Sequence, residues 1–203
     1  MIIIIDNYDP YTNRLYQNIA GKADTRVFHN DKISVAEIEQ MNPTGIILSP
    51  GLGRASKAGI CIELIQKLGN KIPILGIGLG YQAIVEAFDG KVIETPENKQ
   101  QKKIAHLENE LFDSIANIFQ SDTYASTAIE LKSLPAELIV TAICEKQGVM
   151  AVQHVDKPCF GMQINPLSEF TPQGDRILNN FINICRAQGN HHASSTHQQA
   201  FAA

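Results

Sequence analysis

The sequence predicts an α/β domain with a mostly parallel central sheet, helices on both faces of the sheet, and antiparallel additions in the C-terminal half. The first half of the chain alternates between short apolar runs and stretches with helical spacing, whereas the second half has short apolar runs with little helix between them. The chain has 203 residues, of which 44% are hydrophobic and 19% are charged. These values are ordinary for a folded domain with a sizeable core.

The N-terminal half shows the alternation directly. Residues 2–5 are four isoleucines that end at Asp6, which is the pattern of a strand buried on both faces. In residues 12–20 the apolar side chains recur four positions apart and Gly21 follows as a candidate C-cap, so a helix is predicted there. The same criteria give strand 25–28, helix 35–41, strand 45–48, helix 59–68, strand 72–77 and helix 81–88. Strands and helices that alternate in this way form a mostly parallel sheet with right-handed crossovers.

The second half of the chain lacks this alternation. Its apolar segments predict strands at 91–94, 104–107, 139–144, 149–154 and 160–164. Because little helix separates them, we expect these strands to extend the sheet with antiparallel pairing. Residues 175–186 are predicted to close the domain, 1–186, as a helix. Residues 187–203 are small and polar with little apolar periodicity, so they are expected to form a disordered tail.

Charge and hydropathy exclude two classes of partner. The chain has 17 Lys and Arg against 21 Asp and Glu, a net charge of −4, and no basic block that could neutralise a run of phosphates. We therefore expect no nucleic acid to bind. No apolar run approaches the ~20 residues that span a bilayer, so no membrane association is expected. Asp6 interrupts the first apolar run too early for a secretory signal peptide, and the sequence predicts a cytoplasmic protein.

The four cysteines are scattered along the chain, with no C-x-x-C pair and no histidine at metal-ligand spacing. They are Cys61, Cys144, Cys159 and Cys185. This distribution favours reduced thiols over disulfides or a zinc site. No metal site and no cofactor is predicted.

One motif stands at a junction between a strand and a helix. The predicted strand 72–77 runs into the segment Gly-Ile-Gly-Leu-Gly-Tyr-Gln at residues 76–82. A strand, a sharp turn and a helix with the pattern G-x-Nuc-x-G form a nucleophile elbow, whose central residue is held in a strained conformation. Here the central residue is Gly78. Further motifs are D-N-Y-D-P-Y-T at 6–12, S-P-G-L-G at 49–53 and G-M-Q-I-N-P at 161–166.

These motifs, in this order, resemble those of the class I glutamine amidotransferases, and more narrowly those of the small subunit (component II) of anthranilate synthase and of aminodeoxychorismate synthase. The resemblance extends over residues 1–186 and implies the flavodoxin-like fold of that family. In the family, a cysteine at the elbow attacks the side-chain amide of glutamine, a histidine acts as base and acid, and a glutamate orients the histidine. The released ammonia passes to a chorismate-using synthase subunit, so the resemblance implies such a partner.

The positions that match this triad hold other residues. The nucleophile position is Gly78, and the family's segment Q-F-H-P-E-S matches residues 163–168, with Asn165 in place of the histidine and Leu167 in place of the glutamate. A second histidine of the family matches Ala125. Glycine has no side chain that could attack, asparagine does not exchange a proton near neutral pH, and leucine accepts no hydrogen bond. The sequence therefore predicts no catalytic residue and no hydrolysis of glutamine by the family mechanism.

Other matching positions keep small or polar residues. The resemblance implies a vestigial glutamine pocket at Gly51, Leu52, Gly53, Gln82, Ser126 and Thr127. Turn chemistry and plain structural retention are the alternative for this set. Asp6, Asn7, Tyr8 and Asp9 follow the first predicted strand and are predicted to contact a partner. Helix capping and turn formation are the alternative for these four residues.

Three interpretations of function follow. The first is a glutamine amidotransferase-like subunit that cannot hydrolyse glutamine and that stabilises or regulates a chorismate-using synthase. The second is a stand-alone module that binds glutamine or a related small metabolite in the vestigial pocket. The third is an enzyme with a relocated nucleophile, for which Ser49, Ser126 and Cys159 are the nearby residues by motif position. None of these three has a base at a recognisable spacing.

Overall fold

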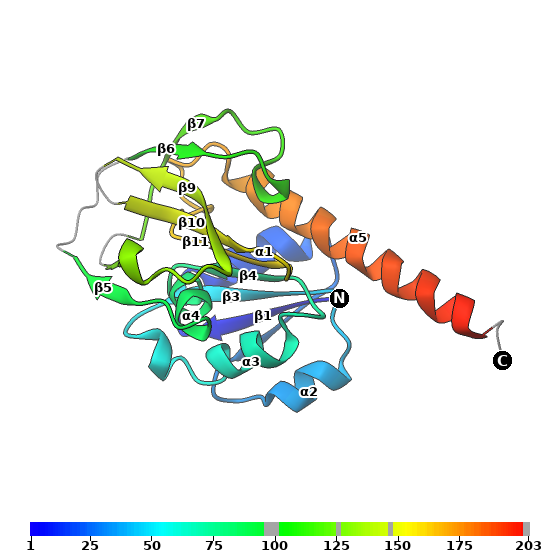
Figure 1. Ribbon diagram of the computed structural model, residues 1–203. Coiled ribbons are helices and arrows are strands. Elements are labelled where there is room, and N and C mark those ends of the chain that lie inside the picture. Colours follow the sequence, from blue (N-terminus) through cyan, green and yellow to red (C-terminus); the bar gives the residue numbers. More distant parts are fainter. Residues whose placement is uncertain (96–101, 125–126, 146–147, 201–203) are drawn as a thin grey trace.

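Nine strands form one sheet in the computed structural model of the chain (Figure 1). The structure describes residues 1–95, 102–124, 127–145 and 148–200, with side chains up to residue 189. The strands of this sheet are β1 (Ile2–Asn7), β2 (Thr25–His29), β3 (Gly45–Gly51), β4 (Ile74–Ile77), β6 (Lys102–His106), β7 (Ile118–Ser121), β9 (Leu138–Cys144), β10 (Gly148–His154) and β11 (Cys159–Met162). Their spatial order is β2-β1-β3-β4-β11-β10-β9-β6-β7. The first five in this order pair in parallel and the others join by antiparallel pairing, which confirms the predicted fold class.

Helices cover both faces of the sheet. They are α1 (Thr12–Ala20), α2 (Val35–Gln40), α3 (Cys61–Leu68), α4 (Leu79–Ala87) and α5 (Gly174–Ala200), with short 3₁₀ turns η1 (Ala55–Lys57), η2 (Glu110–Phe112) and η3 (Leu131–Ser133). Apolar side chains of α2, α3 and α4 form one core with the sheet, and those of α1 and α5 form a second core on the opposite face.

The isoleucine run of β1 explains this burial on two faces. Ile3 and Ile5 belong to the core of α2, α3 and α4, whereas Ile2 and Ile4 belong to the core of α1 and α5. All four side chains are at most 1% exposed. Because side chains alternate between the faces of a sheet, a central strand with both faces covered needs an unbroken apolar run.

The second half of the chain departs from the prediction in its strand pairing. The sequence places residues 91–94 in the main sheet, but β5 (Val92–Glu94) pairs with β8 (Thr127–Ile129) in a separate two-stranded sheet. The sequence does not predict β8, so the separate pairing could not be anticipated. β7 is also not predicted, because this four-residue edge strand buries only every second residue and gives too short a pattern.

The last helix is longer than predicted. The sequence ends it at Arg186, whereas α5 runs to Ala200, and Figure 1 shows its C-terminal turns extending away from the sheet. The division of the chain into a domain 1–186 and a disordered tail 187–203 stays a prediction.

Gly80, in the first turn of α4, lets this helix approach β3 closely. A Cβ atom at residue 80 would lie 2.6 Å from the Cβ of Leu48. Gly80→Ala is therefore expected to lower the free energy of unfolding by about 1–3 kcal/mol, because the helix must move away from the sheet. Urea unfolding monitored by circular dichroism measures this change.

Gly189→Ala in α5 is the matched control for this prediction. Its Cβ would contact only Thr44 Cγ2, at 3.6 Å, which is an ordinary van der Waals distance. Since alanine favours a helix by up to about 1 kcal/mol over glycine, this variant should keep or raise the free energy of unfolding. A Gly80→Ala variant as stable as the unaltered chain would contradict the close approach of α4 to β3.

Candidate functional site

The turn between β4 and α4 is the centre of the candidate site. Its apex, Gly78, has φ +57° and ψ −108°, and its N–H donates a hydrogen bond to the Met162 carbonyl at 3.0 Å. Residues with a side chain rarely adopt such a φ. A Cβ atom at residue 78 would lie 3.2 Å from the Pro50 side chain and 3.2 Å from the Tyr124 ring. The backbone makes the sharp turn that the sequence predicts, but no side chain stands at its apex.

Asn165 and Leu167, the positions matched to the base and its orienting residue, lie on the segment after β11. Asn165 donates its backbone N–H to the Asp122 carbonyl at 2.9 Å, and its Oδ1 accepts the N–H of Leu167 at 3.1 Å. Leu167 is half-buried against the core of α1 and α5, and Arg14 Nη2 donates to its carbonyl at 3.2 Å. The Asn165 side chain thus holds a turn, and Leu167 packs as an apolar group. Neither supplies a group that exchanges a proton.

A cavity of about 730 Å³ opens between the loop after β3, helix α4 and the β5–β8 sheet. Three residues of the predicted pocket line it, namely Gly53, Gln82 and Thr127. Gln82 Nε2 donates to Thr127 Oγ1 at 3.0 Å, so these two side chains form one polar wall. Leu52 does not line the cavity and is 91% exposed, and Gly51 ends β3 beside Asn7. Ser126 and Ala125 lie outside the described residues.

Charged residues that sequence analysis missed complete this cavity. Glu86 lies one turn after Gln82 on α4, and burial raises the pKa of its carboxyl group. Arg54 and Glu94 form an ion pair of 3.2 Å at the exposed rim. The spacing of Gln82 and Glu86, four positions apart on a predicted helix, places both on one helix face and could have identified Glu86. No sequence pattern indicates the pairing of Arg54 with Glu94, because this pairing requires β5 to lie outside the main sheet.

Gln163 and Tyr124 bring further polar groups next to the turn. Gln163 is 2% exposed, and its Nε2 donates to the Tyr124 carbonyl and, at 3.2 Å, to Thr127 Oγ1. In the described part of the chain, Gln163 Oε1 and the Tyr124 hydroxyl are buried and have no hydrogen-bond partner. Burial raises the pKa of Tyr124, so its hydroxyl stays protonated. Polar side chains therefore lie next to the turn, although Gly78 at its apex has no side chain.

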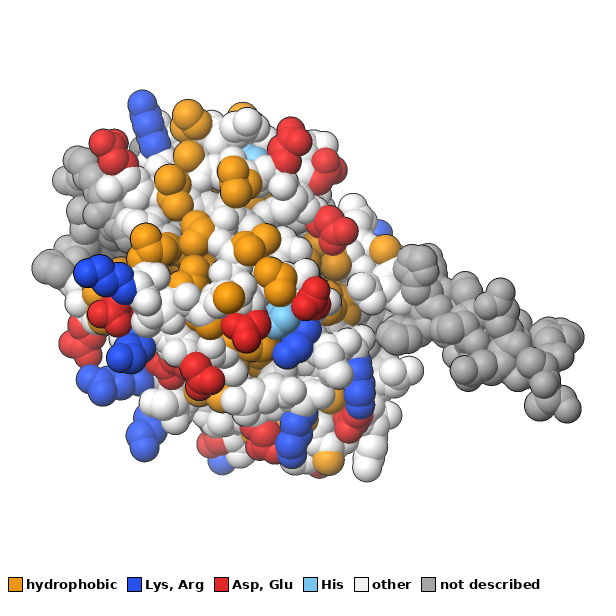
Figure 2. Space-filling model, viewed as in Figure 1, with side chains coloured by type: hydrophobic (Ala, Val, Ile, Leu, Met, Phe, Trp, Pro, Cys, Tyr) orange, Lys and Arg blue, Asp and Glu red, His pale blue; other side chains and the backbone are white. Residues whose placement is uncertain are grey.

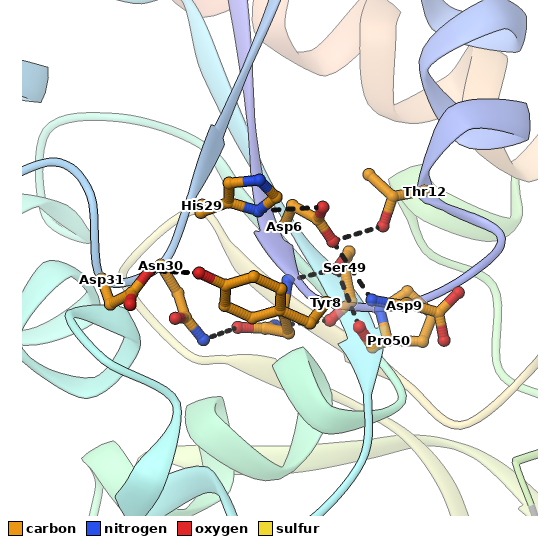
Figure 3. A network of polar contacts seen from close by, with 10 residues as sticks. Asp6, Tyr8, Asp9, Thr12, His29, Asn30, Asp31, Ser49 and Pro50 are labelled. Carbon is orange, nitrogen blue, oxygen red and sulfur yellow. Dashed lines mark hydrogen bonds and ion pairs between the residues drawn. The ribbon is translucent and has the colours of Figure 1, made fainter.

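The residues at the end of β1 belong to the polar network of Figure 3. Asp6 accepts hydrogen bonds from the Thr12 hydroxyl at 2.7 Å and from the Asp9 N–H at 3.2 Å. Asn7 is 4% exposed; its N–H donates to Ser49 Oγ at 2.9 Å, and its Nδ2 donates to the Ser49 carbonyl at 2.7 Å. Asp6 and Asn7 thus fix the start of α1 and join the ends of β1 and β3, which are structural roles.

Tyr8 is the exposed member of this segment. It has φ +61° and is 54% exposed, yet its position is fixed (Figure 3). Its hydroxyl donates to Asp31 Oδ1 at 2.6 Å, and its ring stacks on His29 with 4.5 Å between centroids and 3° between planes. The hydrogen bond raises the pKa of Tyr8 and lowers the pKa of Asp31. His29 Nδ1 in turn lies 3.2 Å from Asp6 Oδ2. A bulky residue at positive φ is strained, so these contacts hold Tyr8 in an unfavourable backbone conformation.

The residues considered as relocated nucleophiles have other roles. Ser49 Oγ donates to the Pro50 carbonyl at 2.8 Å and accepts the Asn7 N–H. Cys159 is fully buried; its Sγ donates to the Gly69 carbonyl at 3.4 Å, and burial raises its pKa to about 12. A thiol with a raised pKa is a poor nucleophile, and a serine needs an adjacent base. Neither residue has the surroundings of an activated nucleophile.

The described residues lack two features, a metal-binding cluster and a membrane-spanning helix. No group of three or more His, Cys, Asp or Glu side chains is placed to hold a metal ion. Within the same ranges, no helix combines the length and the apolar character that a membrane span requires.

A side chain introduced at residue 78 gives a direct test of the turn. Gly78→Cys is expected to lower the free energy of unfolding by about 2–4 kcal/mol, because the side chain adds both backbone strain and crowding against Pro50 and Tyr124. Gly53→Ala is the matched control: Gly53 has φ +90°, but a Cβ there would meet nothing within 4 Å. Gly53→Ala should lower the free energy of unfolding by only about 1–2 kcal/mol, because it adds backbone strain without crowding. Thermal and urea unfolding measure both changes, and a Gly78→Cys variant as stable as the unaltered chain would contradict the tight turn.

The chain is similar to known proteins over most of its length. Residues 3–185 match the family model of class-I glutamine amidotransferases. The chain is 38% identical over 186 residues to anthranilate synthase component 2 of Pyropia yezoensis, covering 90% of this chain and 98% of that protein. It is 37% identical over 185 residues to aminodeoxychorismate synthase component 2 of Escherichia coli, covering 90% and 99%. It is 38% identical over 188 residues, 90% of its length, to the bifunctional protein TrpGD of Thermotoga maritima, and spans 32% of that longer protein.

A solved structure supports the fold. A protein of Thermoplasma acidophilum, assigned provisionally to a GMP synthase, superposes with a TM-score of 0.84 at 23% identity, covering 95% of this chain and 96% of that one. The match of the family model over nearly the whole domain and the identities of 37–38% to full-length relatives show that the chain belongs to the class I glutamine amidotransferase family.

Proposed function

We propose that the chain is a non-catalytic, glutamine amidotransferase-like subunit that stabilises or regulates a chorismate-using synthase. The observation that carries this proposal is the turn at Gly78, which keeps the backbone of a nucleophile elbow and presents no nucleophile. Asn165 and Leu167 supply neither a base nor an orienting carboxylate. All four cysteines are buried, and burial raises the pKa of Cys61, Cys159 and Cys185 to about 12. No described thiol is therefore suited to replace the missing nucleophile.

The names of the similar proteins indicate which class of partner to expect. Proteins 37–38% identical to nearly all of this domain are component 2 of anthranilate synthase and of aminodeoxychorismate synthase. We assign the same association, with a chorismate-using synthase subunit, to this chain. We place the contact at residues 6–9, where Tyr8 is exposed and Asp6 and Asn7 fix the backbone beneath it.

The unpaired state of all four thiols is typical of a reducing compartment, so we assign the complex to the cytoplasm.

A reconstitution assay tests this proposal. The chain is mixed with the chorismate-using synthase subunit of the same organism, and product formation is followed with glutamine or with ammonium as the nitrogen source. We expect a stoichiometric complex that is active with ammonium and inactive with glutamine, because residue 78 offers no atom that could attack the amide. Release of ammonia from glutamine by the purified chain, or absence of a complex, would overturn the proposal.

The triple variant Gly78→Cys, Asn165→His, Leu167→Glu is the control for the assay. If the scaffold retains the polar wall of Gln82 and Thr127, this variant should regain measurable glutamine hydrolysis, and addition of Ala125→His should not lower it. A folded triple variant without activity would show that groups beyond these positions have also changed, such as the donors that stabilise the oxyanion.

A second candidate function is a module that binds glutamine or a related small metabolite. The observation that favours it is the cavity of about 730 Å³, which is of the size that holds a small ligand and which Gly53, Gln82 and Thr127 line. The Gln82 side chain is 7% exposed and already oriented by Thr127, so little conformational entropy is lost when it binds a ligand.

Calorimetric titration with L-glutamine tests this second function. We expect saturable binding without hydrolysis, weakened about tenfold or more by Gln82→Ala because a buried hydrogen-bonding group is removed from the wall. Gln120→Ala, on the exposed side of β7, is the matched control and should bind like the unaltered chain. No saturable heat at millimolar glutamine would exclude glutamine as the ligand.

A further inference from the structure

The turn between β10 and β11 is built around the side chain of His154, the last residue of β10. His154 is only 4% exposed. Its Nδ1 accepts the backbone N–H groups of Asp156 and Lys157, each at 3.0 Å. A ring nitrogen that accepts hydrogen bonds carries no proton, so His154 is the neutral imidazole with its proton on Nε2. The shape of this turn therefore depends on the protonation state of one buried side chain.

The same turn contacts the C-terminal end of α4 through Phe88, the C-cap residue of that helix. The His154 ring lies against the Phe88 ring, with 4.6 Å between centroids and 56° between planes. The Lys157 ammonium lies 4.7 Å from the centroid of the same ring. Two residues of the turn thus hold Phe88, at the end of the helix that carries Gln82 of the cavity wall.

The two ends of the turn are attached through backbone groups. The Val155 N–H donates to the Glu137 carbonyl at 2.9 Å, and the Pro158 carbonyl accepts the N–H of Ile74 in β4 at 2.8 Å. Peptide groups do not titrate near neutral pH, so these bonds persist on acidification. The middle of the turn, residues 156 and 157, is held instead by the titratable Nδ1 of His154.

Burial and nearby charges set the pKa of His154. Burial is the largest influence and lowers this pKa; Lys157 lowers it further, whereas Asp156 and Glu137 raise it, and α4 contributes the uncharged Phe88 ring. On the face of Figure 2, acidic and basic side chains likewise lie close together beside the apolar side chains over the antiparallel strands.

The pKa of His154 in the folded chain therefore lies below its usual value of 6.5. The unfolded chain then binds a proton at residue 154 at a higher pH than the folded chain. Because the unfolded state holds more protons over this range, the contribution of His154 to stability is present above about pH 6.5 and is lost as the pH falls through the pKa of the folded chain.

We propose that the turn from His154 to Pro158 is an acid-sensitive latch on the C-terminal end of α4. A proton from solvent on Nδ1 converts this acceptor into a donor, so the N–H groups of Asp156 and Lys157 lose their partner. The charged ring and the Lys157 ammonium, both beside Phe88, also repel each other. The middle of the turn opens and releases the Phe88 ring, while residues 155 and 158 stay attached. The inference does not depend on the proposed association with a synthase subunit.

Nuclear magnetic resonance of the imidazole nitrogens tests the latch in the unaltered chain. We expect His154 to carry its proton on Nε2 at about pH 7.5 and to titrate below 6.5. Protection of the Asp156 and Lys157 amides against hydrogen exchange should fall about tenfold when His154 is protonated, whereas that of Val155 should persist. A proton on Nδ1 at neutral pH, or a titration midpoint at or above 6.5, would overturn the inference.

His154→Asn separates the hydrogen bonds from the charge. Its Oδ1 stands as many bonds from the backbone as Nδ1, accepts N–H groups in the manner of an Asx turn, and binds no proton in this range. Between about pH 7.5 and 5.5, the melting temperature of the unaltered chain should fall about 3–8 °C further than that of this variant.

His29→Asn is the matched control, since His29 lies on β2 with a side chain that is 49% exposed. This variant should lose as much melting temperature on acidification as the unaltered chain. If His154→Asn also loses as much as the unaltered chain, the hydrogen bonds to Nδ1 do not respond to acid and the latch is wrong.

Discussion

The turn between β4 and α4 is the constraint on which the rest of the site depends. It is held from three sides: the Gly78 N–H is bonded to β11 at Met162, Gly80 lets α4 lie directly against β3, and Pro50 and Tyr124 close over the apex. The peptide backbone and its packing make all of these contacts, and none involves a side chain at residue 78. The neighbouring backbone and side chains therefore fix the shape of the turn.

The turn and the cavity beside it depend on different features of the chain. Gly78 forms the apex of the turn, the Asn165 side chain accepts the Leu167 N–H, and Leu167 packs against the core of α1 and α5. The cavity wall has a connected polar network, in which Gln82 donates to Thr127 Oγ1 and Gln163, from outside the cavity, donates to the same oxygen. Proton transfer depends on the chemical identity of single residues, whereas a cavity depends on the positions of several elements.

The sequence predicts the parallel half of the fold well, because strands buried on both faces produce unbroken apolar runs such as residues 2–5. It also indicates the turn at Gly78 and the polar residues at the end of β1. It misses β8, and with it the β5–β8 sheet that forms one side of the cavity, because three-residue strands carry no periodic signal. The spacing of Gln82 and Glu86, four positions apart on a predicted helix, could have identified Glu86. The pairing of Arg54 with Glu94 depends on tertiary structure alone.

Backbone strain distinguishes the two ends of the site. Gly78 and Tyr8 have nearly equal φ angles, +57° and +61°, and both lie at the carboxyl edge of the parallel strands. At residue 78 glycine adopts this conformation at little cost, so no strain is stored there. At residue 8 an aromatic side chain keeps the strain, and Asp31 and His29 offset it through contacts at the surface. A glycine at residue 8 would adopt this φ with less strain, so the contacts of the Tyr8 ring offset a strain that its own side chain introduces.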